Sequence, residues 1–263
     1  MSETRWHEIR RQFAELSQLD LRHGVFGAST HRYRFGPVVT PGQIDAWERR
    51  HGVTLPADLR TAYLVLGDGT AGPAHGLRPL NEVRLFRPTE PFLGEDHLSQ
   101  AAKDQAGTLG YRYETELDWS VPVDLLTGLL GVIDYGEDIE ICLVVAGQGL
   151  GQISWVHPND ASVLLTQGTL AGLFNNHLQR ELDAFEMIRS ALMSDEPIGV
   201  SIGRLFYNLD TIWGDYLSSF LDLDRPDALF GADVAERRDL ESKRDDWLGA
   251  AFHDGRDRLR SAG

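Results

Sequence analysis

The chain has 263 residues, of which 42% are hydrophobic and 25% charged, and its formal net charge is −15. This composition is typical of a soluble globular protein with one large or two small domains, and the negative charge argues against general binding to nucleic acid or to an anionic membrane. No apolar run approaches the length of a membrane span, and residues 1–8 do not resemble a secretory signal. The single cysteine, Cys142, excludes an intrachain disulfide, and together these features predict a cytoplasmic protein.

The first third of the chain predicts three helices. The first covers residues 3–19 and buries one face, formed by Trp6, Ile9, Phe13 and Leu16. Residues 24–37 lack a helical period and predict a loop or a short strand. Thr40 as N-cap and Gln43 in a capping box begin the second helix, which Gly52 ends. The third is expected over residues 56–66.

A G-x-G-x-x-G pattern occupies residues 67–72. In dinucleotide-binding proteins this pattern joins a strand to a helix whose N-terminus holds a pyrophosphate. Here it follows a predicted helix, and Pro73, Gly76 and Pro79 prevent a stable helix after it. The sequence therefore predicts a helix exit and an irregular loop, with no nucleotide cofactor.

The middle of the chain predicts strands. Residues 83–86 suggest one, and beyond residue 128 glycine turns separate short apolar runs over 130–134, 139–145 and 152–156, with a turn over 135–138. Cys142 falls within one of these strands as a small buried residue. Helical spacing returns over residues 170–192 and again in the tail, whose last helix is expected over 234–252. Helices flanking an antiparallel or mixed twisted sheet make an α+β fold.

A series of motifs carries a family resemblance. It begins with Ile44-x-x-Trp47-Glu48-x-x-x-Gly52-Val53-x-Leu55-Pro56-x-x-Leu59-Arg60-x-x-Tyr63 and continues with Gly67-Asp68-Gly69-x-Ala71-Gly72-Pro73 and Gly76-Leu77-x-Pro79-Leu80. It ends with Gly131-Val132-Ile133-Asp134-Tyr135-Gly136, Leu143-Val144-Val145-x-Gly147, Gly151 and Trp155. These motifs resemble the SUKH superfamily, which includes fungal cell-wall-assembly and killer-toxin-resistance regulators and bacterial toxin-immunity proteins.

The resemblance implies a SUKH-like α+β domain over residues 36–190, preceded by an N-terminal helix and lead-in over 1–35. Residues 195–263 have no counterpart in the family and are expected to form a helical extension packed on the core. The resemblance also implies a scaffold role for ten residues: Trp47, Glu48, Leu55, Pro56, Gly67, Gly69, Gly72, Pro73, Gly76 and Trp155. We expect Trp47 to be a core anchor.

Catalytic and metal-binding motifs are missing from the sequence. The nine histidines are scattered without metal-ligand spacing, and no nucleophile elbow, phosphate loop or EF-hand pattern occurs. We expect no catalytic residue, metal or cofactor.

Acidic residues cluster around the turn between two predicted strands: Asp134, Glu137, Asp138 and Glu140. A solvated hairpin end is the simplest interpretation, and a role in general acid–base chemistry would require a pocket that shifts their pKa values. A third hypothesis is that these residues, with Asp68 and Asp118, present an exposed negative face to a basic partner.

The leading functional hypothesis is a non-enzymatic immunity protein that binds a cognate toxin domain with a basic face and occludes its active site. The alternative is an intracellular regulatory or scaffold protein with an endogenous protein partner, as the fungal relatives suggest. An enzyme is the third possibility and would need a pocket with convergent polar groups.

Overall fold

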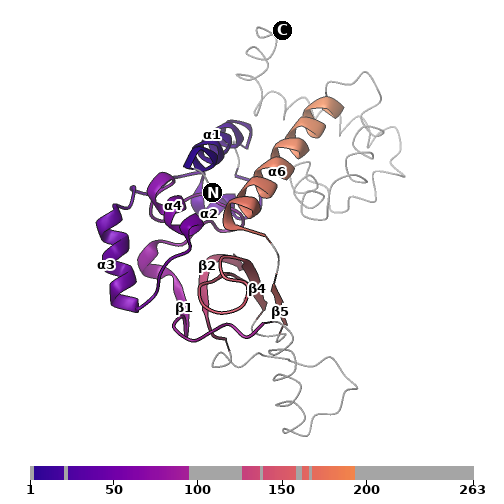
Figure 1. The fold of residues 1–263 in the computed structure, drawn as a ribbon. Coiled ribbons are helices and arrows are strands. Elements are labelled where there is room, and N and C mark those ends of the chain that lie inside the picture. Colours follow the sequence, from indigo (N-terminus) through magenta and orange to yellow (C-terminus); the bar gives the residue numbers. More distant parts are fainter. Residues whose placement is uncertain are drawn as a thin grey trace, which may run out of the picture. The chain divides into compact units, whose positions relative to one another are not determined.

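The computed structural model describes residues 3–20, 23–94, 126–136, 139–157, 162–165 and 168–192. The chain divides into two compact units, Met1–Ala14 with Phe26–Leu178, and Glu15–Val25 with Gln179–Gly263. The first unit has the α+β fold that the sequence predicts (Figure 1). The predicted extension over 195–263 lies outside the described residues.

Helices precede and follow the sheet in the chain. They are α1 (Glu3–Leu19), α2 (Ala28–His31), α3 (Pro41–His51), α4 (Ala57–Val65), the 3₁₀ helix η1 (Leu80–Glu82) and α6 (Leu170–Leu192). The start of α3 follows from its sequence, because Thr40 and Gln43 form the expected capping box and Gly52 ends the helix with φ 67°. The short helix α2 lies where the sequence predicts a loop or strand.

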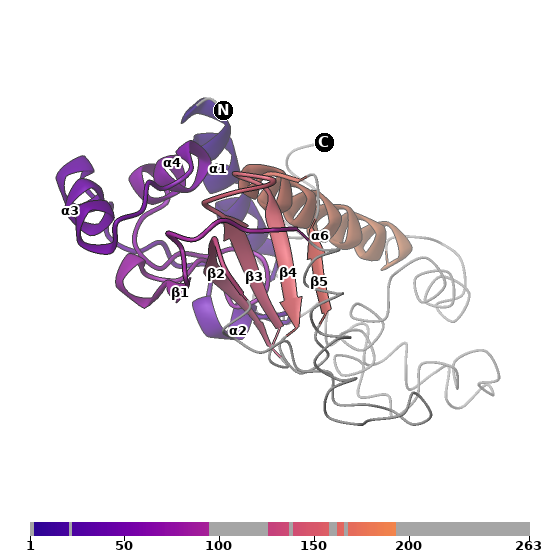
Figure 2. The same ribbon diagram turned by 60° about the horizontal axis from the view of Figure 1, so that its bottom comes forward.

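One carboxylate joins three helices of the first unit. Asp58 in α4 accepts a hydrogen bond from Nε1 of Trp6 in α1 at 3.1 Å and one from the amide of Ala171, at the start of α6, at 2.8 Å. The rings of Trp6 and Phe174 meet edge to face, 5.3 Å apart. In this unit the helices α1, α4 and α6 therefore pack together, and they lie on one side of the sheet (Figures 1 and 2).

The sheet has five strands in the order β1-β2-β3-β4-β5, and each neighbouring pair is antiparallel. The strands are β1 (Arg84–Phe86), β2 (Leu129–Gly136), β3 (Ile139–Val144), β4 (Ile153–His157) and β5 (Ser162–Leu165). The sequence predicts the β2–β4 meander but misses β5. It also ends β2 too early, because Tyr135 and Gly136 continue the strand instead of forming a turn.

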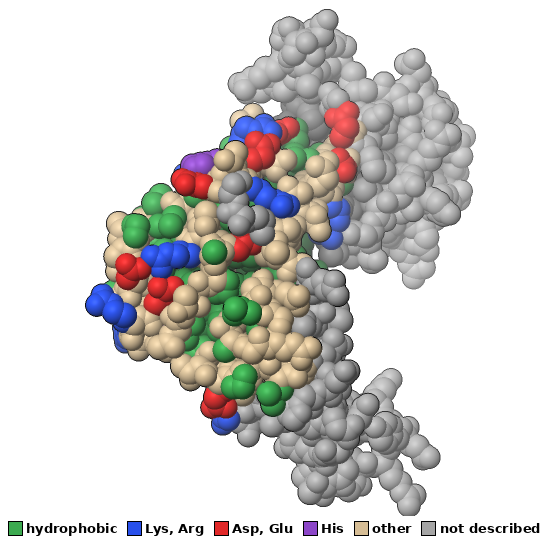
Figure 3. All heavy atoms as spheres, viewed as in Figure 1, with side chains coloured by type: hydrophobic (Ala, Val, Ile, Leu, Met, Phe, Trp, Pro, Cys, Tyr) green, Lys and Arg blue, Asp and Glu red, His purple; other side chains and the backbone are tan. Residues whose placement is uncertain are grey.

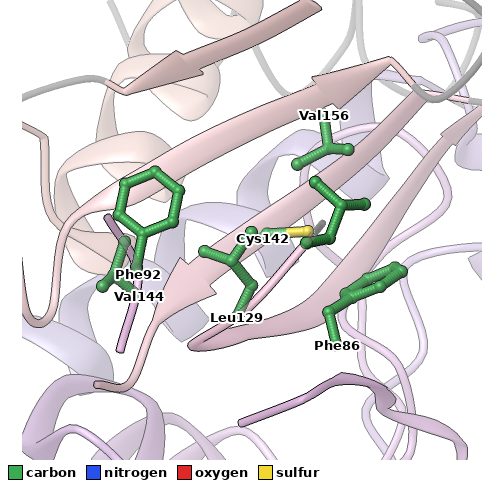
Figure 4. Close-up of a cluster of buried hydrophobic side chains, with 7 residues drawn as sticks. Phe86, Phe92, Leu129, Cys142, Val144 and Val156 are labelled. Atoms are coloured by element: carbon green, nitrogen blue, oxygen red, sulfur yellow. The ribbon is translucent and has the colours of Figure 1, made fainter. Parts of the chain in front are cut away.

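Strand register assigns each side chain to one of two faces. Ile133, Ile141 and Trp155 are paired across β2, β3 and β4 and share one face of the sheet. The opposite face carries a buried cluster made of Phe86, Phe92, Leu126, Leu129, Cys142, Val144 and Val156 (Figure 4). Cys142 is buried in this cluster, as expected.

Within the described residues, no helix is long and apolar enough to cross a membrane.

Candidate partner-binding surface

Two loops meet at the end of the sheet where β2 leads into β3. One contains α2, and the other is the glycine loop, residues 67–80. Their backbones touch so closely that a Cβ atom on Gly27 would lie 1.9 Å from the carbonyl oxygen of Ala74. The amide of His75 donates to the carbonyl oxygen of Asp134 in β2 at 3.3 Å. These contacts fix both loops against the end of β2.

Four aromatic side chains gather at this position: Phe26, His75, Tyr135 and Trp155. We call them the hairpin-end aromatic cluster. The ring centroids of Phe26 lie 5.7 Å from His75 and 5.2 Å from Tyr135, and Tyr135 meets Trp155 edge to face at 4.9 Å. Because β3 lies between β2 and β4, the Tyr135–Trp155 contact passes over β3.

The aromatic cluster is partly open to solvent. Phe26 is 36% exposed, and the other three side chains are half-buried. The imidazole of His75 is held by Thr30, whose hydroxyl lies 3.0 Å from Nδ1. Large aromatic side chains that are fixed in position and partly exposed are typical of protein-binding surfaces.

Unusual backbone geometry occurs in both loops that carry the cluster. Arg32, Tyr33 and Ala74 have φ values of 48°, 55° and 49°, in the left-handed region that residues other than glycine rarely adopt. Such conformations cost free energy and tend to concentrate at functional sites. Ala74 directly precedes His75, and Arg32 follows soon after Thr30, so the strain lies beside two residues that build the surface.

The opposite face of the same sheet end carries a charged group of four residues. Glu140 is only 2% exposed, and Arg78 contacts its Oε1 at 3.1 Å while Arg84 contacts its Oε2 at 3.1 Å. Arg78 also pairs with Asp134 at 3.3 Å. Burial lowers the pKa of Arg78, but the hydrogen bond and charge of Glu140, with Asp134, leave that pKa raised. Two arginines thus neutralise two carboxylates.

Gly131 makes this arrangement possible. A Cβ atom at Gly131 would lie 2.5 Å from Oε1 of Glu140. The missing side chain on β2 therefore leaves room for the carboxylate of Glu140, which extends from β3 toward Arg84 on β1.

The predicted exposed acidic face is wrong for Glu140, because that carboxylate is buried between two arginines. Asp134 has a 48% exposed side chain, which accepts from the amide of Gly136 at 2.9 Å and pairs with Arg78. Asp68 shapes the glycine loop, since its Oδ1 accepts from the amide of Leu80 at 2.6 Å. Three further predicted residues, Asp118, Glu137 and Asp138, lie outside the described residues.

The predicted scaffold residues of α3 and α4 are linked through Glu48. Its two carboxylate oxygens accept from the amide of Leu55 at 2.8 Å and from Arg60 at 2.9 Å, which fixes the connection into α4 after Pro56. Trp47 is half-buried and lies 4.5 Å from the ring of His51, so the expectation of a core anchor is wrong. Ile44 is the buried residue of α3.

The scaffold glycines serve close backbone packing. A Cβ atom at Gly67 would lie 2.2 Å from the carbonyl oxygen of Gly36, and one at Gly72 would lie 2.9 Å from the ring of Phe174. The loop turns at Gly67, Gly69 and Gly76 with positive φ. Pro73 contributes its carbonyl oxygen to the amide of Gly76 at 3.0 Å.

Amides of the G-x-G-x-x-G segment are occupied by the protein itself. The amide of Asp68 donates to the carbonyl oxygen of Pro37 at 2.8 Å. The amide of Thr70 donates to that of Leu77 at 3.1 Å, and the amide of Ala71 to that of Arg34 at 2.8 Å. A phosphate-binding loop needs such amides free to bind the phosphate and a helix that begins directly after the loop. The helix α4 precedes the glycines, so the pattern marks a helix exit and a packed loop, as predicted.

Sequence reasoning missed most of the aromatic cluster. The family motifs include Tyr135 and Trp155, and only Trp155 is among the predicted scaffold residues. Tyr135 follows Ile133 by two residues, and this strand spacing could have placed both on one face. No sequence signal locates Phe26 or His75 at the same position. Among the described residues, no group of three or more His, Cys, Asp or Glu side chains could hold a metal ion.

Three comparisons with known proteins give no match: no family model, no curated protein and no solved structure matches the chain. The similarity to the SUKH superfamily therefore rests on the sequence motifs and stays a prediction.

Proposed function

We propose that the chain is a non-enzymatic immunity protein of the SUKH type, which binds a cognate toxin domain in the cytoplasm and occludes its active site. The observation that carries the proposal is the hairpin-end aromatic cluster, a fixed and partly exposed group of large side chains. Residues that dominate binding energy at protein interfaces are enriched in Trp, Tyr and Arg. The sheet end offers Tyr135 and Trp155 on one face and Arg78 and Arg84 on the other.

The charge of the chain supports a basic partner, through long-range attraction. The described segments contain 13 of the 25 basic residues but only 15 of the 40 acidic residues, so most of the net charge of −15 belongs to other parts of the chain. Figure 3 shows charges of both signs interspersed on the described surface. Attraction by the whole chain would speed the encounter, while short-range contacts at the cluster would hold the complex.

The experiment is co-expression of the chain with each candidate toxin domain encoded beside its gene. Wild-type chain should restore growth, and Phe26→Ser should weaken protection while the purified variant keeps its melting temperature within a few degrees. Leu150→Ser is the matched control, because Leu150 is an exposed apolar residue, 65% accessible, outside the cluster. It should protect as well as wild type.

Two results would overturn the proposal. One is full toxicity with wild-type chain and every neighbouring toxin candidate. The other is a growth defect on deleting the gene in cells that make no toxin, which would favour the alternative of a regulatory or scaffold protein with an endogenous partner.

A further inference from the structure

We infer that the hairpin-end aromatic cluster accepts a positively charged side chain, arginine or lysine, from a basic segment of the partner protein. This inference rests on the proposed binding function and adds the chemistry of the contact. The faces of aromatic rings carry partial negative charge and attract a cation held within about 6 Å of the ring centre.

In the described segments this contact already occurs between side chains of the chain itself. The guanidinium of Arg10 lies over the ring of Phe35 at 4.5 Å, and that of Arg84 lies over Phe86 at 5.9 Å. Arg10 also donates to the carbonyl oxygen of Val65 at 2.6 Å, so its position over Phe35 is fixed by the end of α4. These two rings receive their cation from the chain.

The aromatic cluster differs in this respect. In the part of the chain that the structure describes, no arginine or lysine lies over Phe26, Tyr135 or Trp155. The contacts within the cluster are tilted by 48° and 51° or edge to face at 67°, and none is a parallel stack. In such contacts the rings do not cover each other's faces as a parallel stack would, and the cluster is partly exposed to solvent.

Charge complementarity favours a cation over other occupants. An anion would be repelled by the ring faces and by the net charge of −15. Asp134, beside the cluster in sequence, does not compete as the contact point, because it lies on the opposite face and is paired with Arg78. A basic side chain gains both the ring contact and attraction to the acidic chain.

The test uses the full chain labelled with 5-fluorotryptophan and two short peptides, one containing four arginines and one with four citrullines in their place. Citrulline has nearly the same shape as arginine but no charge. The Trp155 signal in the ¹⁹F spectrum is identified with Trp155→Phe. We expect the arginine peptide to shift this signal at 0.3 M salt and the citrulline peptide to leave it unchanged.

Two variants distinguish binding at the aromatic cluster from general attraction of the peptide to an acidic chain. Tyr135→Leu removes a ring while keeping an apolar side chain, and it should weaken binding of the arginine peptide about three- to tenfold. Glu82→Gln removes an exposed charge away from the cluster and should change binding by less than twofold. If both peptides shifted the ¹⁹F signal of Trp155 equally, the contact would not depend on the positive charge. If the arginine peptide left this signal unmoved, the cluster would not be its binding site. Either result overturns the inference.

Failure of this inference is distinguishable from failure of the proposed function. If protection against the toxin depends on Phe26 but the two peptides behave alike, the immunity role stands and the cation contact is wrong. If the arginine peptide binds as expected but no neighbouring toxin is neutralised, the contact stands and the partner is another basic protein.

Discussion

Asp134 and Tyr135 are adjacent in β2, but their side chains lie on opposite faces of the sheet. Asp134 pairs with Arg78 on the face of Glu140, and Tyr135 contacts Trp155 on the face of Ile133 and Ile141. Charge and aromatic surface at this sheet end are therefore separate features that can be altered independently.

The first prediction uses this separation. Tyr135→Ala should weaken toxin binding at least tenfold, because it removes a ring from the centre of the proposed contact. Asp134→Asn should change the equilibrium affinity by less than threefold and act mainly on the association rate at low salt. Calorimetry and stopped-flow kinetics with the purified toxin domain measure both. The opposite order of effects would locate the contact on the charged face.

The second prediction concerns the buried carboxylate of Glu140. Glu140→Gln removes the charged acceptor of the hydrogen bonds from Arg78 and Arg84 and should lower the free energy of unfolding by about 1–3 kcal/mol, because hydrogen bonds to a charged group contribute about this much. Urea denaturation followed by circular dichroism measures the loss. The control Glu82→Gln, at an exposed residue, should stay within about 0.5 kcal/mol of wild type.

A third prediction compares two glycines. Gly131→Ala should destabilise the fold by about 1–3 kcal/mol, because the new methyl group occupies the space of the Glu140 carboxylate. At Gly42 in α3 an added Cβ meets nothing within 4 Å, so Gly42→Ala should stabilise by about 0.5 kcal/mol. Thermal denaturation measures the stability of both variants. A similar loss of stability in both would contradict the role given to Gly131.

The fourth prediction concerns Cys142. Burial, together with the negative charge of Glu140, raises the pKa of its thiol well above the ordinary value. The folded protein should therefore resist iodoacetamide at pH 8, and labelling should begin only when urea unfolds the chain. Mass spectrometry gives the labelled fraction at each urea concentration.

The same pKa shift has a consequence for stability. Above about pH 8.5 the unfolded chain releases the thiol proton while the folded chain keeps it, so this contribution to stability is complete at lower pH and is lost as pH rises. The Cys142→Ala variant should show a shallower decline of stability between about pH 8.5 and 10. A decline of unchanged slope would show that the thiol does not contribute.

Local signals predicted the parts of the fold that depend on neighbours in sequence. The capping box at Thr40 and Gln43 determines the start of α3, and glycine turns determine the β2–β4 meander. Burial of Glu140 could not be predicted in this way, since its partners Arg78 and Arg84 are 62 and 56 residues away. An acidic residue beside a turn was expected to be exposed, and only the tertiary contacts show that it is not.

The candidate surface was even less predictable. Phe26 and His75 come from loops whose positions depend on backbone contacts such as that between Gly27 and Ala74. Tyr135 belongs to an irregular end of β2, where the pairing with β3 shifts register between Asp134 and Gly136. The family motifs include Tyr135 and Trp155 but give no indication that their rings meet.

The pairing of Trp155 with Ile141 also links folding to recognition. A slip of β4 by one residue would turn the indole to the other side of the sheet, into the layer of Cys142 and Val144, and would leave Tyr135 without its aromatic neighbour. A misfolded chain would then be unable to bind its partner, even if its helices had formed. Binding competence at this surface would therefore report on the fidelity of strand pairing.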